Sequence, residues 1–209
     1  MSPRTQLQFE EIREEKKTLI MDAALEQFAS EGYYATTISQ IANHAGISKG
    51  LLYNYFESTE ALLIAILQRS VMEIYKYFDV NKDGYLTEEE FEYFVRKISV
   101  VLREKRSFWR LFFQLVMQKE VREKFSVLSS RPLIRMEFLT GEEHFISIIS
   151  DIITDYFSRK KMKKGPEYDP VTDMNMFLIT LKGYAITRIY VEEDKDDDKI
   201  IDRIVEIFK

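Results

Sequence analysis

Oxygen-bearing side chains recur at alternate positions in the stretch DVNKDGYLTEEE, residues 79–90. Counted from the first residue, side-chain oxygens stand at positions one, three, five, nine and twelve, and position seven can offer a backbone carbonyl. These residues are Asp79, Asn81, Asp83, Tyr85, Thr87 and Glu90. Gly84 stands at position six, where the chain has to turn sharply. Calcium takes roughly six to eight oxygen ligands, so the spacing predicts a calcium-binding loop.

The same spacing defines an EF-hand loop, which a helix flanks on each side. Helical patterns do lie before and after residues 79–90, and Leu86 at position eight is apolar. A second run of alternating acids, residues 194–198, has Lys199 where the glycine should stand. No partner loop is therefore predicted.

A second interpretation of the loop needs no cation. Residues 82–84 form a favourable turn, and Thr87 with Glu90 has the spacing of a capping box. This interpretation leaves Asp79 and Asn81 unexplained. Both interpretations stay open at this point, and calcium is the one cofactor that the sequence suggests.

Helical periodicity dominates the rest of the chain, and no convincing strand pattern occurs. With only 7 Gly and 4 Pro among 209 residues, long helices are favoured. The chain is therefore predicted to be all-α. The predicted helices cover residues 8–32, 37–46, 48–56 and 58–78 before the loop, and 89–105, 108–118, 140–165, 169–192 and 199–209 after it.

Composition excludes several classes of protein. Without cysteine there is no disulfide or thiolate metal site. The N-terminus lacks the apolar core of a signal peptide, and no apolar run is long enough to span a membrane, so we expect a cytoplasmic protein with no membrane partner. Neither His44 nor His144 has the neighbours of a catalytic residue, and no enzyme activity is predicted.

Residues 38–56, ISQIANHAGISKGLLYNYF, have the pattern of two short helices joined by a tight turn. Gly46 stands where this turn needs an unusual backbone angle. The second helix carries Lys49, Tyr53 and Asn54 and no acid, although the first sixty residues are acidic in sum. The pattern predicts a DNA-binding helix-turn-helix. A plain helical hairpin packed in a core is the alternative.

The stretch from Leu19 to Phe56 resembles the DNA-binding head of the TetR family of bacterial repressors. The matching landmarks are Ala23-Ala24, Phe28, Gly32-Tyr33, Thr36-Thr37-Ile38, Ile41-Ala42, Ala45-Gly46-Ile47-Ser48, Gly50 and Leu52-Tyr53-Asn54-Tyr55-Phe56. The resemblance implies a homodimer that binds a palindromic DNA operator and responds to a small-molecule inducer. Thr37 and Ser48 would then contact phosphates, and Lys49, Gly50, Tyr53, Asn54 and Tyr55 would lie at or near the DNA. Many relatives have Lys where Thr59 stands, which suggests modest, salt-sensitive affinity.

Two domains are predicted on this basis: a DNA-binding domain at residues 1–57, and a helical sensing and dimerisation domain at residues 58–209 that contains the loop. An apolar ligand pocket, or plain core, is predicted from Phe108, Trp109, Phe112, Phe113 and Met117. Dimerisation is expected through helices at about 142–163 and 171–192, where Gly183 and Ala185 are small. The basic run at 160–164 is expected to be a solvated helix end.

Two functions remain open from the sequence. The first is a ligand-responsive dimeric transcriptional repressor, although the sequence does not distinguish a repressor from an activator. The second is a calcium-binding sensor or buffer in which the helix-turn-helix is only a scaffold. A DNA-shift assay would separate them.

Overall fold

The computed structural model describes residues 6–78, 80–125, 143–191 and 197–209. Every regular element within these ranges is a helix, which confirms the all-α prediction. None of the described helices is long and apolar enough to cross a membrane.

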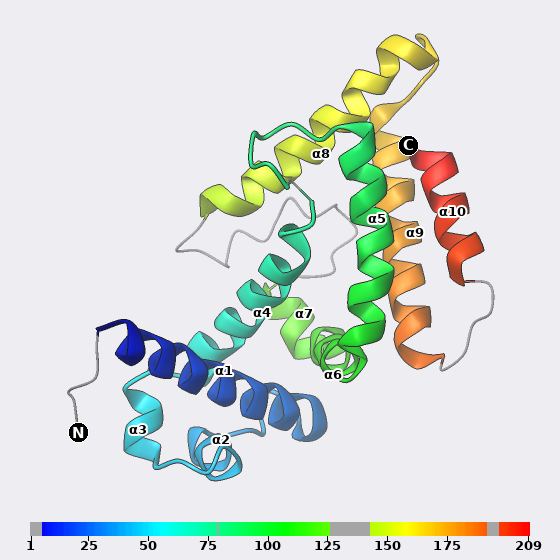
Figure 1. Cartoon of the computed structure of the whole chain (residues 1–209). Helices are drawn as coiled ribbons and strands as arrows, with labels where there is room; N and C mark the ends of the chain where they lie inside the picture. The colour runs from blue at the N-terminus through cyan, green and yellow to red at the C-terminus, as the bar shows by residue number, and fades with distance from the viewer. Residues whose placement is uncertain (1–5, 79, 126–142, 192–196) are drawn as a thin grey trace.

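Four helices build the N-terminal part of the molecule (Figure 1): α1 (Gln6–Glu31), α2 (Ile38–His44), α3 (Lys49–Tyr53) and α4 (Thr59–Tyr75). The starts of α2, α3 and α4 are fixed by side chains of Thr37, Ser48 and Ser58, each of which accepts a hydrogen bond from a backbone N–H of the first turn. Gly46 makes the turn between α2 and α3 with φ +65°, as predicted. These caps and this turn set the angle of α3.

Six further helices form the body: α5 (Glu88–Glu104), α6 (Arg106–Met117), α7 (Lys119–Phe125), α8 (Glu143–Lys164), α9 (Pro170–Tyr190) and α10 (Asp197–Phe208). The short helix α7 was not predicted. Helix α4 ends at Tyr75, three residues before the predicted end, because the backbone tightens into turns at 76–78. Thr140, where a capping box was predicted, lies outside the described residues.

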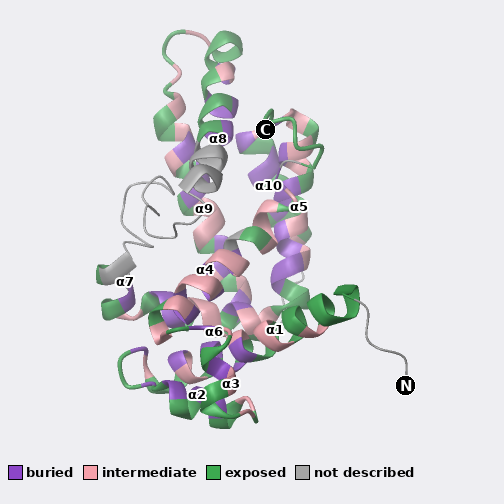
Figure 2. Cartoon of the chain, turned by 90° about the vertical axis from the view of Figure 1, so that its left-hand side faces the viewer, coloured by how far each residue is buried: buried purple, intermediate pink, exposed green. Residues whose placement is uncertain are grey.

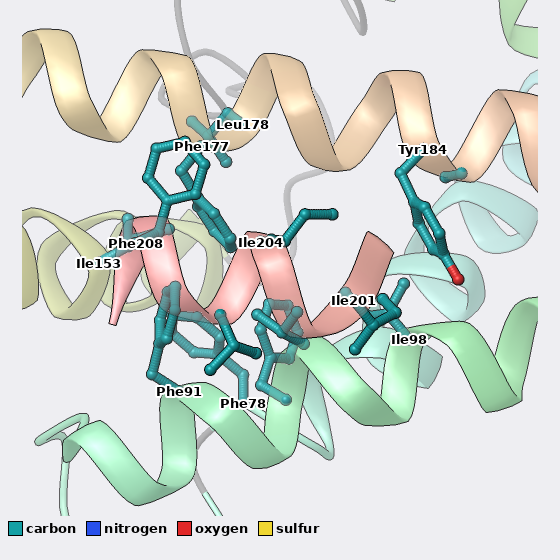
Figure 3. Packing of buried hydrophobic residues seen from close by; sticks show 14 of the residues in the cluster. Phe78, Phe91, Ile98, Ile153, Phe177, Leu178, Tyr184, Ile201, Ile204 and Phe208 are labelled. Atoms are coloured by element: carbon teal, nitrogen blue, oxygen red, sulfur yellow. The ribbon is translucent and has the colours of Figure 1, made fainter. Parts of the chain in front are cut away.

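Aromatic side chains fill the core of the body (Figure 3). The ring of Phe91 on α5 stacks on Tyr156 of α8, with centroids 4.6 Å apart. The Phe91 ring also lies 4.9 Å from the ring of Phe177 on α9. Phe208 of α10 closes the cluster at 5.4 Å from Phe177. Helices α5, α8, α9 and α10 are therefore held around one shared core.

A second core lies under the N-terminal helices (Figure 2). It joins Ile20, Phe28 and Leu52 to residues of α4 and also to Leu115 and Val116 at the end of α6. The predicted boundary at residue 57 therefore runs through a continuous cluster of buried side chains.

One residue of the predicted solvated helix end is buried. Lys160 is 5% exposed, and its amine lies 4.6 Å from the ring centroid of Tyr156 and 5.2 Å from that of Phe157. It donates hydrogen bonds to the carbonyls of Phe208 and Lys209. The prediction of a solvated end was wrong for Lys160, because its position on α8 points the side chain toward the end of α10.

Candidate nucleic-acid interface and cation-binding loop

Helix α3 presents an exposed face that carries no acid. Lys49, Gly50 and Asn54 are exposed and Tyr53 is 48% exposed, while Leu52 is fully buried and anchors the helix. The amine of Lys49 lies 5.8 Å from the ring centroid of Tyr53. A cation and an aromatic ring thus share one side of α3, as a surface for phosphates and base edges requires.

The predicted phosphate contacts flank this face. Thr37 and Ser48 are exposed, and both hydroxyls already cap helices: Gln40 N–H donates to Thr37 Oγ1 at 3.3 Å, and Leu51 N–H donates to Ser48 Oγ at 3.1 Å. The Ser48 hydroxyl hydrogen can still turn toward a phosphate oxygen, whereas the Thr37 hydroxyl donates to Gln40 Oε1 at 2.7 Å and would have to leave it. The structure therefore brings the predicted contacts to one end of the molecule.

Tyr55 sits at the edge of this surface and is half-buried. The guanidinium of Arg13 on α1 lies 5.5 Å from its ring centroid. Sequence reasoning did not single out Arg13, because nothing in the local pattern of α1 shows that it meets α3. It adds a second cation beside the face.

The predicted cation loop holds its shape through its own side chains. Asn81 Oδ1 accepts from the Asp83 N–H at 3.1 Å, and Asp83 Oδ1 accepts from the Tyr85 N–H at 2.8 Å. Gly84 has φ +76°, the sharp turn expected at position six. Asp79, the predicted first ligand, lies outside the described residues.

Glu90, the predicted twelfth ligand, is engaged elsewhere. Its Oε2 accepts from the Thr87 N–H and from the Thr87 hydroxyl, both at 3.0 Å, and its own N–H donates to Thr87 Oγ1. The capping box of the cation-free interpretation is thus formed. Across the described residues, no three acidic or histidine side chains are gathered as a metal would need.

The donor set nevertheless suits a hard cation. Asn81, Asp83, Thr87 and Glu90 each offer an oxygen ligand, and the carbonyl of Tyr85 completes the described positions. For Glu90 to bind a cation, its carboxylate would have to leave Thr87. The residues therefore fit calcium in kind and spacing, with a rearrangement at Glu90.

Comparisons with known proteins agree with this geometry. The model of bacterial regulatory proteins of the tetR family matches residues 20–66, which include α2 and α3, and the EF hand domain model matches residues 70–98. Residues 20–66 thus resemble the DNA-binding domain of TetR-family regulators. The chain also carries an EF-hand-like segment between α4 and α5, so both predicted resemblances are confirmed.

Similarity to known regulators extends beyond the head. The fatty acid metabolism regulator protein of Bacillus subtilis is 26% identical over 146 residues, 70% of each chain. The HTH-type regulator YuxN of the same organism is 49% identical over 53 residues, 25% of this chain and only 18% of YuxN. The fatty acid degradation regulator FadR of Bacillus halodurans has the same fold, with a TM-score of 0.60 and 21% identity over 92% of this chain and 94% of that one.

The five residues of the predicted ligand pocket differ in burial and lie in different parts of the described structure. Trp109 is buried in the body core, Phe112 and Phe113 are partly buried between the two cores, and Met117 is 42% exposed. Phe108 alone of the five lines a cavity of about 410 Å³ between α1, α4 and α6. That cavity also has charged walls, so it differs from the apolar pocket expected.

Ion pairs cross this cavity and join the TetR head to the body. Arg69 of α4 donates to Asp22 of α1 at 2.6 Å, and its guanidinium lies 5.1 Å from the ring centroid of Phe108 on α6. Burial raises the pKa of Glu73, but hydrogen bonds from Lys105 and Lys76 outweigh it and hold that pKa below its ordinary value. Glu73 therefore stays charged and links α4 to the start of α6.

Gln118, just after α6, makes a second connection to the head. Its amide nitrogen donates to the carbonyl of Phe28 at 2.7 Å, and its amide oxygen accepts from the Tyr33 N–H at 3.0 Å. Helix α6 is thus fastened to the head near both of its ends. A displacement of α6 would reach α1 directly.

Replacing Gln118 with Met is expected to lower the free energy of unfolding by about 1–3 kcal/mol, because two partly buried backbone groups lose their partner. Amide exchange at Tyr33 should quicken more than elsewhere. Gln114→Met, on the exposed side of the same helix, is the control. Unchanged exchange at Tyr33 would show that Gln118 does not hold the head.

Helix α9 exposes an apolar stripe. Met176 and Ile179 are 53% and 67% exposed, and Gly183 and Tyr190 follow at helical spacing on the same side. Ala185, which was expected on the contact face with Gly183, is 8% exposed and belongs to the body core, so that expectation was wrong. A step of two residues turns the helix by about 200°, and the two small residues face opposite ways.

Proposed function

We propose that this protein is a TetR-family regulator, a ligand-responsive dimeric repressor that binds a palindromic operator through α3. The observation that carries the proposal is the exposed, acid-free face of α3, fixed by the caps at Thr37 and Ser48 and by the buried Leu52. Such a helix enters the major groove in helix-turn-helix proteins. A DNA-binding regulator of this kind acts in the cytoplasm of a bacterium.

Each residue of the interface has a role in this proposal. Thr37 and Ser48 position the head through phosphates, which carry no sequence information. Lys49, Tyr53 and Asn54 reach base edges, and Gly50 lets the backbone approach the DNA closely. Tyr55, with Arg13 over its ring, borders the groove.

Replacing Tyr53 with Ala is expected to weaken operator binding by about 1–3 kcal/mol, because a side chain at the centre of the face is lost. The measurement is a titration of labelled operator DNA selected from a random duplex library. Tyr93→Ala, which removes an exposed ring from α5, is the control. Equal affinity of folded Tyr53→Ala and wild type would refute the assignment of this face.

The effector is proposed to bind in the body beside Trp109. The indole Nε1 of this buried side chain has no hydrogen-bond partner among the described residues. A buried donor without an acceptor is costly, and a ligand oxygen would relieve it. Two of the relatives are fatty acid regulators, and a fatty acyl ligand would combine an apolar chain with such an oxygen.

The dimer is proposed to form around α9. The stripe from Met176 to Tyr190 is apolar, whereas the exposed side of α8 carries Asp151, Asp155 and Ser158 and only near its end the exposed Met162. Exposed apolar side chains of α10, Ile200 and Ile207, extend the stripe on one side. Self-association would bury this surface and fix the distance between the two heads.

Calcium is proposed to bind in the loop at 79–90 and to brace the angle between α4 and α5. The match of the EF hand model and the all-oxygen donor set support this proposal. They also support the alternative function, a calcium sensor or buffer whose helix-turn-helix is only a scaffold. Failure to shift any DNA in the library would favour that alternative.

A calcium titration of wild type and Glu90→Gln tests the site. Gln can still accept the capping-box hydrogen bonds, so this change removes the charge and leaves the cap. Wild type is expected to melt roughly 5–10 °C higher at about a hundred times Kd, and the variant is not. If neither responds at millimolar calcium, the loop is a turn with a cap and binds no cation.

A further inference from the structure

The loop is docked on α8 by one side chain, Arg159. Its Nη2 donates to the carbonyl of Leu86 at 2.6 Å, and its Nη1 donates to the hydroxyl of Tyr85 at 2.7 Å. The guanidinium carbon also lies 3.9 Å from the ring centroid of Tyr85. Figure 1 shows the chain between α4 and α5 lying beside α8, in agreement with these contacts.

The third nitrogen of Arg159 is held on its own helix. Its Nε donates to Asp155 Oδ2 at 2.7 Å, one turn earlier on α8. All three guanidinium nitrogens are therefore used, and the fork is oriented before it meets the loop. A second ion pair, from Lys163 to Glu88 at 2.6 Å, joins the same two segments.

The residues that Arg159 holds are the seventh and eighth of the loop. Leu86 is fully buried in the body core, so its carbonyl needs a partner inside the protein. The sequence offers no second loop that could supply one. Arg159 fills this role, and it does so beside the Tyr85 carbonyl that the cation would bind.

We propose that Arg159 is a positioning residue that couples cation binding in the loop to helix α8. The inference rests on the proposed calcium site. A cation that draws the Tyr85 carbonyl inward must move or tighten the segment that Arg159 holds. Coupling of this kind is reciprocal, so Arg159 also raises the affinity of the loop for the cation.

The coupling defines where a bound cation would act. Helix α8 packs along α9, which carries the apolar stripe proposed as the dimer surface. The cation would therefore act on the distance between the heads through α8 and α9. The head itself is connected to the body through α6. Arg159 does not connect the loop to α6.

Terbium luminescence and hydrogen exchange of the full-length protein test the proposal together. Terbium replaces calcium in oxygen sites and emits when a nearby tyrosine, here Tyr85, is excited; Glu90→Gln should remove this emission. Arg159→Gln is expected to weaken terbium and calcium binding about tenfold, the effect of one lost charge-assisted hydrogen bond. Arg203→Gln, which removes an exposed ion pair of α10, is the control.

Hydrogen exchange is a measurement that would not change if Arg159 had only a structural role. Calcium should slow amide exchange in α8 around residue 159 in wild type and in the control. In Arg159→Gln at saturating calcium, the loop should still be protected and α8 should no longer respond. Asp155→Asn, which removes the charge that holds Nε without touching the loop, should give a weaker form of the same result.

The outcomes separate the two proposals. Calcium binding with an α8 response that is equal in wild type, Arg159→Gln and Asp155→Asn overturns the coupling and leaves the calcium site intact. A wild-type protein without terbium emission or calcium-dependent exchange overturns the calcium site and the coupling with it. Should Arg159→Gln fail to fold, Asp155→Asn alone decides.

Discussion

Ile179→Glu is expected to turn the dimer into a monomer. The side chain is 67% exposed at the middle of the apolar stripe of α9, and a two-fold axis would bring two introduced carboxylates into one dry interface. An unpaired buried charge costs about 3–5 kcal/mol, so the dimer should dissociate a hundredfold more readily or worse. Sedimentation at micromolar protein measures the change.

Operator binding should weaken when dimerisation is lost. A monomer can reach only one half-site, and it loses the gain that comes from tethering two heads. Tyr93→Glu, at an exposed position of α5, adds the same charge and should stay dimeric. A dimeric Ile179→Glu with wild-type operator affinity would show that α9 is not the contact helix.

The buried amine of Lys160 should make stability depend on pH in the alkaline range. Burial lowers the pKa of Lys160 to about 8, from an ordinary value of 10.5. Between these values the unfolded chain binds a proton that the folded chain does not, so stability rises with pH. Below pH 8 the cost of charging the buried amine is fully present, on the order of 3 kcal/mol.

Lys160→Met isolates this effect, because Met has a similar length and cannot be charged. Urea unfolding of both proteins at pH 7 and pH 10 should show the variant gaining about 2–3 kcal/mol relative to wild type at the lower pH. The rings of Tyr156 and Phe157 stabilise the charged amine, so they reduce the expected stability gain of the variant toward about 2 kcal/mol. Lys161→Met, one residue on and exposed, should follow the wild-type profile.

A difference in stability that stays constant from pH 7 to pH 10 would contradict a depressed pKa. The amine would then be charged throughout, held by the aromatic faces and by the two carbonyls at the end of α10. Stability would be governed by those contacts and not by the proton.

Local signals made the head predictable from sequence. The capping box at Thr37, the glycine at 46 and the apolar positions around Leu52 are all set by neighbours within a few residues. The EF-hand spacing is equally local. Helix α7 was missed because a single residue in extended conformation, Gln118, separates it from α6, and no glycine or typical capping residue marks its start.

Contacts between segments that lie far apart in the sequence could not be predicted. The lysines at 160–164 read as one solvated run, yet one of them points inward because α10 ends beside it. Ala185 and Gly183 were assigned to one face although a helix places them on opposite sides. The sequence does not indicate the contacts of Arg159, because its partners, Tyr85 and Leu86, belong to another part of the chain.

The shared core under the head has a consequence for how such regulators can be recombined. Leu115, Val116 and Val121 lie beyond the predicted DNA-binding domain, yet they complete the cluster that supports α1 and α2. A fragment cut after residue 57 would expose that cluster to water. Exchange of heads between such regulators should therefore succeed only when the end of α6 is exchanged with them, because the head shares its core with part of the body.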